Sequence, residues 1–202
     1  YGRWFALRLP EHGAAMVIGL FTDPVWTDPV WISASSLGLA LLLGAAALHK
    51  WRDRGGFAQV LKNYGLLPRG LEKPLTLLLA VLELATATAL LLPAWRTPAA
   101  LVAAALLLLY ACVMALSLLQ GRRIADCGCH FGEQRQAVST PLVWRNLLLV
   151  LLALNLLQTP GARVLGLFDA LLIGGLLICG CIFYLLANTL IANQHSAREL
   201  SL

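Results

Sequence analysis

The chain has 202 residues, of which 59% are hydrophobic and only 12% are charged. A soluble domain is usually about a quarter charged, so this composition excludes an ordinary soluble globular protein and predicts an integral membrane protein. The formal net charge is +5. The basic residues lie in the connections between apolar runs, where they anchor helices against anionic headgroups, so we expect membrane lipid and no nucleic acid as a partner.

Residues 1–30 are predicted to form an N-terminal interfacial segment. Arg3 and Arg8 precede the apolar run 13–21, which is too short to span a bilayer and is not followed by a small-x-small cleavage site. The pentapeptide Thr-Asp-Pro-Val-Trp then occurs twice in tandem, over residues 22–31. Asp-Pro pairs favour turns and tryptophan favours the membrane interface, so the repeat is expected to mark the entry to the first span.

Five apolar stretches approach the roughly 17 to 25 residues that a transmembrane helix needs. They are residues 31–48, 75–92, 99–119, 141–157 and 165–191. We therefore predict an all-α integral membrane protein, with a four-helix transmembrane bundle in residues 31–157. Residues 158–202 add a fifth C-terminal transmembrane helix and a short polar tail. Two prolines in residues 93–98 predict a tight hairpin, which makes the second and third spans antiparallel neighbours.

Two longer connections, residues 49–73 and 120–140, are basic. In the first, Phe57, Val60, Leu61 and Tyr64 repeat at helical spacing, which predicts an amphipathic helix lying on the membrane. Five spans place both connections on the same side of the membrane. The positive-inside rule makes that side cytoplasmic.

The chemically most informative residues are Cys127-Gly128-Cys129, in the second of these connections, with Asp126 before them and His130 after them. The glycine lets the backbone fold tightly enough for the two cysteines to form a disulfide. A strained disulfide in so small a ring would be readily reducible. His130 favours a thiolate and Asp126 opposes it, so the direction of the thiol pKa shift is left open.

Two other interpretations of this motif stay open. Cysteine and glycine are small, and the segment could be a turn without chemistry. Cys127, Cys129 and His130 are also soft metal ligands, but they are crowded into four residues and lack the separated second pair of a usual zinc site. We therefore favour redox use and predict no metal.

A second Cys-Gly-Cys, formed by Cys179, Gly180 and Cys181, lies inside the fifth apolar stretch. On a regular helix, residues two apart point to nearly opposite faces, so this pair cannot bond unless the helix unwinds around its glycines. Small residues that allow close helix packing are the favoured interpretation, with a second thiol pair as the alternative. Cys112 in the third span is also interpreted as a packing residue.

Ionisable and amide side chains inside the spans form a second candidate site. Such groups are costly in lipid and normally face the bundle interior or a partner. Glu83 lies midway along the second span, and pairing with Arg145 or His49 is considered for it. His49 and Lys50 together close the first span and are interpreted most simply as an interface anchor. The remaining candidates are Arg145, Asn146, Asn155 and Asp169.

The order and spacing of several short motifs resemble the MauE family of small membrane proteins, relatives of the DoxX superfamily. The resemblance covers residues 30–157 and leaves the N-terminal segment and the fifth span unmatched. Its motifs are Leu48-His49-Lys50, Gly56-Phe57, Tyr64-Gly65-Leu66-Leu67-Pro68, Glu83, residues 90–93, Asp126-Cys127-Gly128-Cys129, Phe131-Gly132 and Val143-Trp144-Arg145-Asn146.

The resemblance implies a four-helix core in the bacterial cytoplasmic (inner) membrane and a role in redox maturation of an exported protein. In the MauE case that protein is the disulfide-rich small subunit of methylamine dehydrogenase, and a thioredoxin-like protein, MauD, is the partner. Carried over to this chain, Cys127 and Cys129 would exchange with such a partner, with Arg145 and Asn146 near them and Glu83 in the bundle. Exported disulfide chemistry needs the periplasmic side, against the charge count, and we adopt the periplasmic side on the family argument.

Three functions are therefore carried forward. The first is an accessory component of thiol-disulfide exchange, with no cofactor required and a quinone compatible as electron acceptor or donor; whether the chain is itself an enzyme is left open. The second is a non-enzymatic membrane scaffold with a structural loop disulfide. The third is a small transporter using Glu83 and Asp169, although no inverted repeat is detected.

Overall fold

The computed structural model describes residues 25–65, 68, 70–121 and 138–199, and all of its regular structure is helical. The all-α prediction is confirmed. Most of the predicted interfacial segment 1–30, and residues 126–130 with the first cysteine pair, lie outside the described residues. The elements are η1 (Val25–Thr27), α2 (Pro29–Arg52), α3 (Arg54–Tyr64), α4 (Glu72–Leu90), η2 (Pro93–Trp95), α5 (Arg96–Leu119), α6 (Thr140–Asn155) and α7 (Leu167–Glu199).

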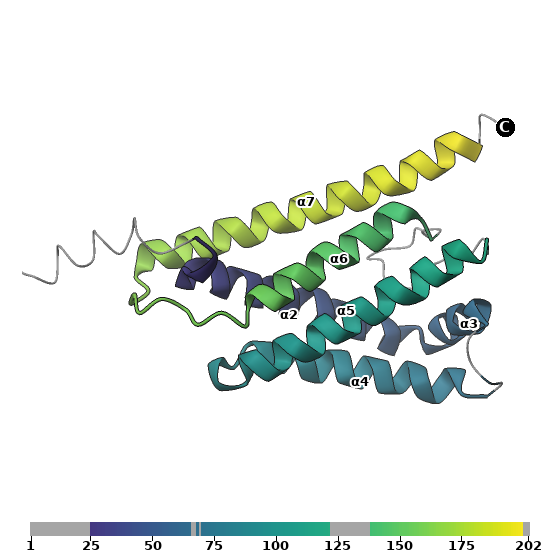
Figure 1. Ribbon diagram of the computed structural model, residues 1–202, viewed down its shortest axis with the longest axis horizontal. Helices are drawn as coiled ribbons and strands as arrows, with labels where there is room; N and C mark the ends of the chain where they lie inside the picture. Colours follow the sequence, from purple (N-terminus) through teal and green to yellow (C-terminus); the bar gives the residue numbers. More distant parts are fainter. Residues whose placement is uncertain (1–24, 66–67, 69, 122–137, 200–202) are drawn as a thin grey trace, which may run out of the picture.

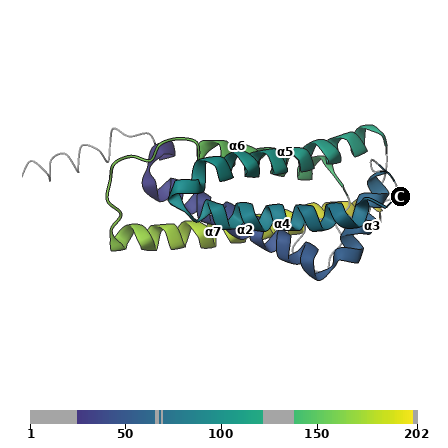
Figure 2. The ribbon, with the colours of Figure 1, turned by 90° about the horizontal axis from the view of Figure 1, so that it is seen from below.

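Four long helices form the bundle, with α2 packed on α4, α4 on α5, α5 on α6 and α6 on α2 (Figure 1). The prediction that the second and third spans are antiparallel neighbours is confirmed by the α4–α5 hairpin at η2. Seen from below, α5 and α6 form one layer and α2, α4 and α7 the other (Figure 2). The fifth long helix, α7, contacts the bundle mainly through α2.

Among the described residues, four helical stretches are long and apolar enough to cross a membrane: Pro29–Arg52, Glu72–Leu90, Pro93–Leu119 and Leu167–Ile191. The fourth predicted span forms α6, but this helix has only 16 residues. At 1.5 Å per residue it is ~24 Å long, which is shorter than the ~30 Å hydrocarbon core of a bilayer. Helix α6 is therefore an apolar member of the bundle that is too short to span a bilayer unless the bilayer becomes thinner around it.

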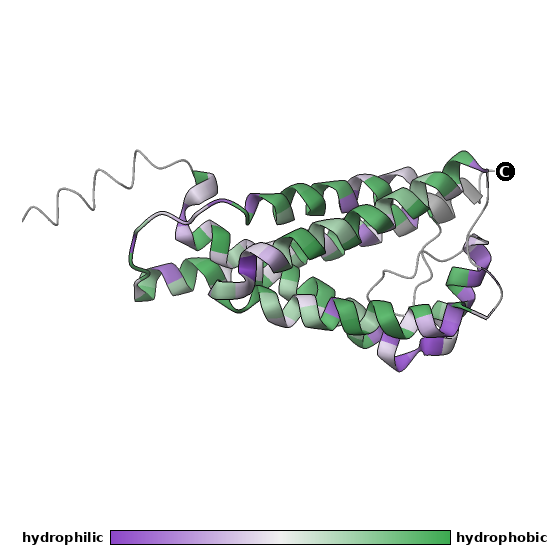
Figure 3. Cartoon of the chain, turned by 60° about the horizontal axis from the view of Figure 1, so that its bottom comes forward, coloured by the Kyte–Doolittle hydropathy of each residue, from purple (hydrophilic) through white to green (hydrophobic). Residues whose placement is uncertain are grey.

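The bundle interior is built from small and medium apolar residues. Ala99, Ala100, Ala103 and Ala104 of α5 are all buried, and they let α5 approach its neighbours closely. The outward faces carry leucine, valine and phenylalanine, and the hydropathy colouring shows apolar surface along all long helices with polar residues gathered at their ends (Figure 3). This distribution is the one expected for a protein whose sides face lipid.

Helix α3 begins after Asp53, whose carboxylate accepts a hydrogen bond from Gly56 N at 2.8 Å, and ends at Gly65 in the left-handed conformation (φ 64°). The predicted amphipathic helix is confirmed. Its predicted contact with the membrane is wrong for the apolar face, because Phe57, Val60 and Tyr64 are buried. They pack against residues of α4, α5 and α6, so the bundle takes the place of lipid.

The two ends of the bundle differ. At one end lie α3, the described residues that flank segment 122–137, and the C-terminal end of α7; at the other lie η2 and the connection from α6 to α7 (Figure 1). This agrees with the prediction that the two basic connections share a side. We call the first the α3 end and the second the hairpin end.

The hairpin end is held together by Arg163, which bonds Asp28 at 3.2 Å and Asp169 at 2.9 Å. Asp28 also caps α2 by accepting from Val30 N. Burial lowers the pKa of the Arg163 guanidinium, but the two carboxylates raise it by more, so its pKa lies above the ordinary value. Arg163 therefore stays charged and ties the start of α2 to the start of α7.

We expect Arg163→Gln to lower the free energy of unfolding by about 1 kcal/mol, the upper range for partly exposed ion pairs. The loss should appear as a lower thermal midpoint in detergent, and it should shrink when salt screens the pair in the parent protein. An unchanged midpoint at low salt would show that this contact does not stabilise the fold.

Candidate functional site

A buried ion pair between α2 and α4 is the most unusual polar feature of the described bundle. Lys50 Nζ lies 2.8 Å from Glu83 Oε1 and 2.9 Å from Oε2, and both side chains have an exposed fraction of zero. Two opposite charges removed from water stay together because either one alone would be left uncompensated in a medium of low polarity. The pair therefore fixes the height of α2 against α4.

Two aromatic side chains complete this site. Tyr110 of α5 donates its hydroxyl to Glu83 Oε1 at 2.5 Å. The Lys50 ammonium also lies 4.8 Å from the ring centre of Phe57 on α3 and 5.4 Å from that of Tyr110. Cation–π contacts of this kind use the part of the ammonium that the carboxylate does not cover. The four residues, which we call the ion-pair cluster, thus join α2, α3, α4 and α5.

The interpretation of Lys50 as an interface anchor is wrong, because its ammonium is buried under α3 rather than extended to the membrane surface. Glu83 does face a partner inside the bundle, but its cation is Lys50 and not Arg145 or His49. Helix α3 explains the difference, since it covers the end of α2 where a lysine would otherwise reach water. His49 is half-buried beside Lys50.

Arg145 instead donates from Nη1 to Asn188 Oδ1 of α7 at 2.7 Å, and its guanidinium lies 5.4 Å from the ring centre of Tyr184. It therefore links α6 to α7. Asn155, at the end of α6, accepts a hydrogen bond from the Trp31 indole at 3.1 Å. Both groups serve as contacts between helices.

Asn146 belongs to the same level of the bundle as the ion-pair cluster. Met114 of α5 and Leu142 of α6 lie in one buried cluster. Tyr110 lies four residues before Met114, and Asn146 lies four residues after Leu142. Because α5 and α6 are antiparallel, each step leads one turn further into the bundle, so Tyr110 and Asn146 lie at similar height. Asn146 is 2% exposed, and its amide nitrogen has no hydrogen-bond partner among the described residues. A buried donor of this kind costs stability unless an acceptor or a water reaches it.

The second Cys-Gly-Cys lies on α7, which is a continuous helix through Gly174, Gly175 and Gly180. Cys179 and Cys181 are free and exposed, as is Cys112 on α5. The helix does not unwind, so Cys179 and Cys181 do not bond to each other. The interpretation of Cys112 as a packing residue is wrong, because its side chain is exposed on the surface of α5.

The first cysteine pair lies in segment 122–137, together with Asp126 and His130, and outside the described residues. The segment joins Gly121, after α5, to Val138, before α6, at the α3 end of the bundle (Figure 1). Cys127 and Cys129 are thus carried by the connection at the end where the ion-pair cluster lies. Among the described residues, no group of three or more potential metal ligands is found.

Tyr110 and Phe57 were not predicted as members of the site. Tyr110 is a tyrosine in a helix made almost entirely of alanine and leucine, and a hydroxyl in such a setting indicates a buried polar partner. Phe57 was recognised as part of an amphipathic repeat and of the Gly56-Phe57 motif, but not as a contact of a buried charge. Its contact with Lys50 depends on how the chain turns between α2 and α3, and no spacing rule predicts that turn.

Comparison with known families gives a match over residues 29–159 to the family model described as "Methylamine utilisation protein MauE". The chain belongs to the MauE family. The matched region includes the ion-pair cluster, segment 122–137 and Asn146, and it leaves α7 outside. The predicted membership is confirmed.

Curated MauE proteins give the same result. The chain is 45% identical over 116 residues to methylamine utilization protein MauE of Paracoccus denitrificans, covering 57% of this chain and 62% of that protein. It is 47% identical over 95 residues to the protein of Methylophilus methylotrophus, covering 47% of this chain and 50% of that protein. The match thus spans between half and about six-tenths of the length of these two relatives.

A longer match is made with methylamine utilization protein MauE of Methylorubrum extorquens, with 35% identity over 155 residues, or 76% of this chain and 81% of that protein. No solved structure matches the chain. The family membership therefore rests on sequence similarity. The ion-pair cluster is known from the contacts within this chain.

We expect Glu83→Leu to lower the free energy of unfolding by about 3 to 5 kcal/mol, because it leaves the Lys50 ammonium buried without a counter-charge. The double variant Lys50→Met/Glu83→Leu should recover most of this loss, since two apolar side chains of similar size leave no unpaired charge. Thermal unfolding in detergent compares the variants. A double variant no more stable than Glu83→Leu would contradict this account.

Tyr110→Phe removes the hydroxyl bond to Glu83 but keeps the ring beside Lys50. We expect a loss of about 1.5 to 3 kcal/mol, as for hydrogen bonds to charged groups. Tyr110→Leu removes the ring as well and should cost more. Equal stability of the two variants in the same unfolding assay would show that the ring contact with Lys50 contributes nothing.

Proposed function

We propose that this protein is a membrane accessory component of methylamine utilisation that carries out thiol-disulfide exchange through Cys127 and Cys129. The family membership supports the pathway, because the MauE relatives are named for methylamine utilization. The observation that carries the redox part is the Cys-Gly-Cys of segment 122–137, whose two ends are fixed by α5 and α6 at the α3 end of the bundle.

Such an exchange needs only two cysteines and an accessible partner. The thiolate of one cysteine attacks the disulfide of a thioredoxin-like protein, a mixed disulfide forms, and a partner thiolate leaves. The second cysteine then attacks the mixed disulfide and releases the partner as a dithiol. Two electrons and two protons pass to the partner, while Cys127 and Cys129 become a disulfide; the reverse sequence oxidises the partner.

The bundle supports this proposal as a rigid base. The segment begins and ends on two helices that pack closely against each other. Reactive groups on a connection are positioned best when the scaffold beneath them is rigid. The chain is a multi-pass membrane protein, and we place it in the bacterial cytoplasmic membrane with this segment in the periplasm, where an exported disulfide-containing protein or its thioredoxin-like partner would meet it.

We expect Cys127→Ser/Cys129→Ser to abolish growth on methylamine in a strain that depends on this protein, while its level in the membrane stays normal. Cys179→Ser/Cys181→Ser is the matched control, because it removes the same number of thiols from another Cys-Gly-Cys on the exposed surface of α7. Growth should be unchanged in this control.

Single variants then identify the exchange itself. Cys129→Ser should trap a mixed disulfide between Cys127 and a partner protein, visible as a band on a non-reducing gel that disappears with reductant. A membrane-impermeant maleimide applied to intact cells should label the pair after mild reduction. Normal growth of the double serine variant would refute thiol exchange and leave the scaffold or transporter functions.

A further inference from the structure

Arg145 is a cation of the bundle that meets no carboxylate in the described part of the chain. It lies in α6, five residues after Thr140, where that helix begins. Its Nη1 donates to the amide oxygen of Asn188 on α7 at 2.7 Å, and its guanidinium lies 5.4 Å from the ring centre of Tyr184. An amide and a phenol are both neutral at pH 7. The positive charge of Arg145 is therefore oriented by these contacts but not compensated by them.

The carboxylates whose side chains the structure describes are all engaged elsewhere. Two of them hold Arg163, one holds Lys50, and two accept hydrogen bonds from backbone amides. They are, in this order, Asp28 and Asp169, Glu83, and Asp53 and Glu72. Lys50 and Arg163 thus each have a counter-charge, whereas Arg145 does not. A cation within a membrane bundle is costly unless a partner balances it, so Arg145 requires an anion from outside these residues.

The guanidinium of Arg145 has donors to offer to such an anion. It carries five N–H groups in a planar fork, and the hydrogen bond to Asn188 is the one it makes among the described residues. Its Nε has no hydrogen-bond partner there. The side chain is half-buried, so part of the fork remains accessible. The oxygen acceptors that match this fork best are those of a carboxylate or a phosphate.

The surroundings of Arg145 face lipid. Helices α6 and α7 lie in different layers, and α7 packs mainly on α2 (Figure 2). On either side of Arg145 along α6, Trp144 is 63% and Leu148 is 64% exposed, and Leu185 beside Tyr184 on α7 is also exposed. Large apolar side chains exposed on membrane helices are covered by acyl chains. An anion that reaches Arg145 from this side is therefore carried by a lipid.

The depth of Arg145 agrees with a lipid headgroup. Five residues of helix place it ~7.5 Å from the start of α6, a distance that a long arginine side chain partly recovers by extending toward the surface. Because α6 is shorter than the hydrocarbon core, a bilayer that becomes thinner around it brings the headgroups closer still. Trp144, the preceding residue, is of the type enriched at headgroup level. The positive end of the α6 helix dipole faces the same surface.

We propose that Arg145, oriented by Asn188 and Tyr184, binds the phosphate of an anionic phospholipid between α6 and α7. The lipid supplies the counter-charge that the described carboxylates do not supply. A phospholipid with a choline headgroup brings its own cation and is neutral as a whole, so it balances Arg145 less well. The bound lipid adds a contact between α6, which belongs to the family core, and α7, which lies outside it.

The test uses the purified full chain in a zwitterionic detergent. The chain is titrated with dioleoylphosphatidylglycerol, dioleoylphosphatidylcholine or inorganic phosphate, and native mass spectrometry counts the molecules that stay bound. We expect the parent to retain one phosphatidylglycerol in preference to phosphatidylcholine. Arg145→Gln should lower the affinity for phosphatidylglycerol by about fivefold, the contribution of one basic residue next to an anionic surface.

Asn188→Asp tests the same site with the arginine in place. It puts a carboxylate where the amide oxygen now lies, 2.7 Å from Nη1, with almost no change of shape. We expect this internal counter-charge to replace the lipid, so the preference for phosphatidylglycerol should fall as in Arg145→Gln. The thermal midpoint in phosphatidylcholine nanodiscs should stay at or above that of the parent, because a new ion pair joins α6 to α7. Lost preference in a folded variant separates lipid binding from a purely structural role of Arg145.

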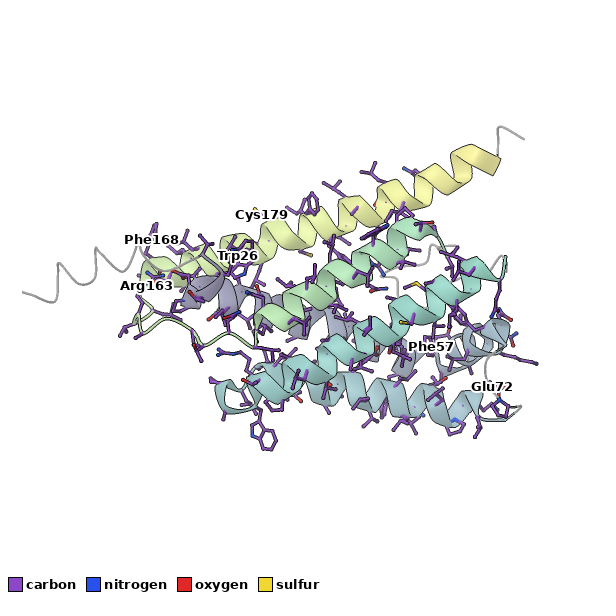
Figure 4. All side chains as sticks on the ribbon, viewed as in Figure 1. Trp26, Phe57, Glu72, Arg163, Phe168 and Cys179 are labelled. Carbon is purple, nitrogen blue, oxygen red and sulfur yellow. The ribbon has the colours of Figure 1, made fainter. Side chains whose placement is uncertain are left out.

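Arg163→Gln is the matched control, because it changes the net charge as Arg145→Gln does but removes a cation that already has two carboxylates, at the hairpin end (Figure 4). It should keep the preference of the parent for phosphatidylglycerol. An equal loss in this control would overturn the site, since it would reflect net charge alone. Equal binding of the two lipids by the parent, or full preference in both Arg145→Gln and Asn188→Asp, would also overturn it. Displacement of the lipid by inorganic phosphate at similar concentration would assign the site to the free ion instead.

Discussion

The cost of burying a charge away from water is the constraint from which this bundle is best understood. Lys50 and Glu83 have no exposed surface, and each is tolerated only because the other lies within 3 Å. Satisfying them requires α2 and α4 to meet at one height, α5 to bring the Tyr110 hydroxyl, and α3 to bring the Phe57 ring. Four helices are thus placed relative to one another by the ion pair and its two aromatic contacts.

The rest of the bundle interior is apolar and permits many similar packings. Alanine-rich α5 and leucine-rich α4 and α6 fit together by shape, and shape alone discriminates weakly between neighbouring registers. A polar contact within such an interior specifies one register, because every displaced arrangement separates the charges. The Arg163 contacts act in the same sense at the hairpin end, where they join the starts of α2 and α7.

The four-helix bundle and segment 122–137 both belong to the part of the chain that is shared with the family. The MauE family match covers both, and it ends before α7. Helix α7 lies at the outside of the bundle and is attached mainly to α2, with Arg145 of α6 bonded to its Asn188. The helices of the family core therefore contribute most of the buried residues, and α7 contributes few of them.

Hydrophobic length and periodicity were sufficient to predict the class, the long helices, the α4–α5 hairpin and the amphipathic α3. These features follow from the need of every backbone group to be bonded within its own helix in lipid, which is local along the chain. The Cys-Gly-Cys pairs were also visible as sequence, and the helical spacing correctly indicated that Cys179 and Cys181 would not pair. The partner of Glu83 was not predictable in this way.

Lys50 and Glu83 are distant in sequence, and several cations were available to the carboxylate. Only the packing of α3 over the end of α2 decided that Lys50 is buried and that Phe57 covers it. The same packing turned the apolar face of α3 toward Met114, Val138 and Leu142 instead of lipid. Rules that are local along the chain predict a helix and its faces. The partner of a buried side chain depends instead on the free-energy difference between whole arrangements of helices, and only the tertiary structure decides that difference.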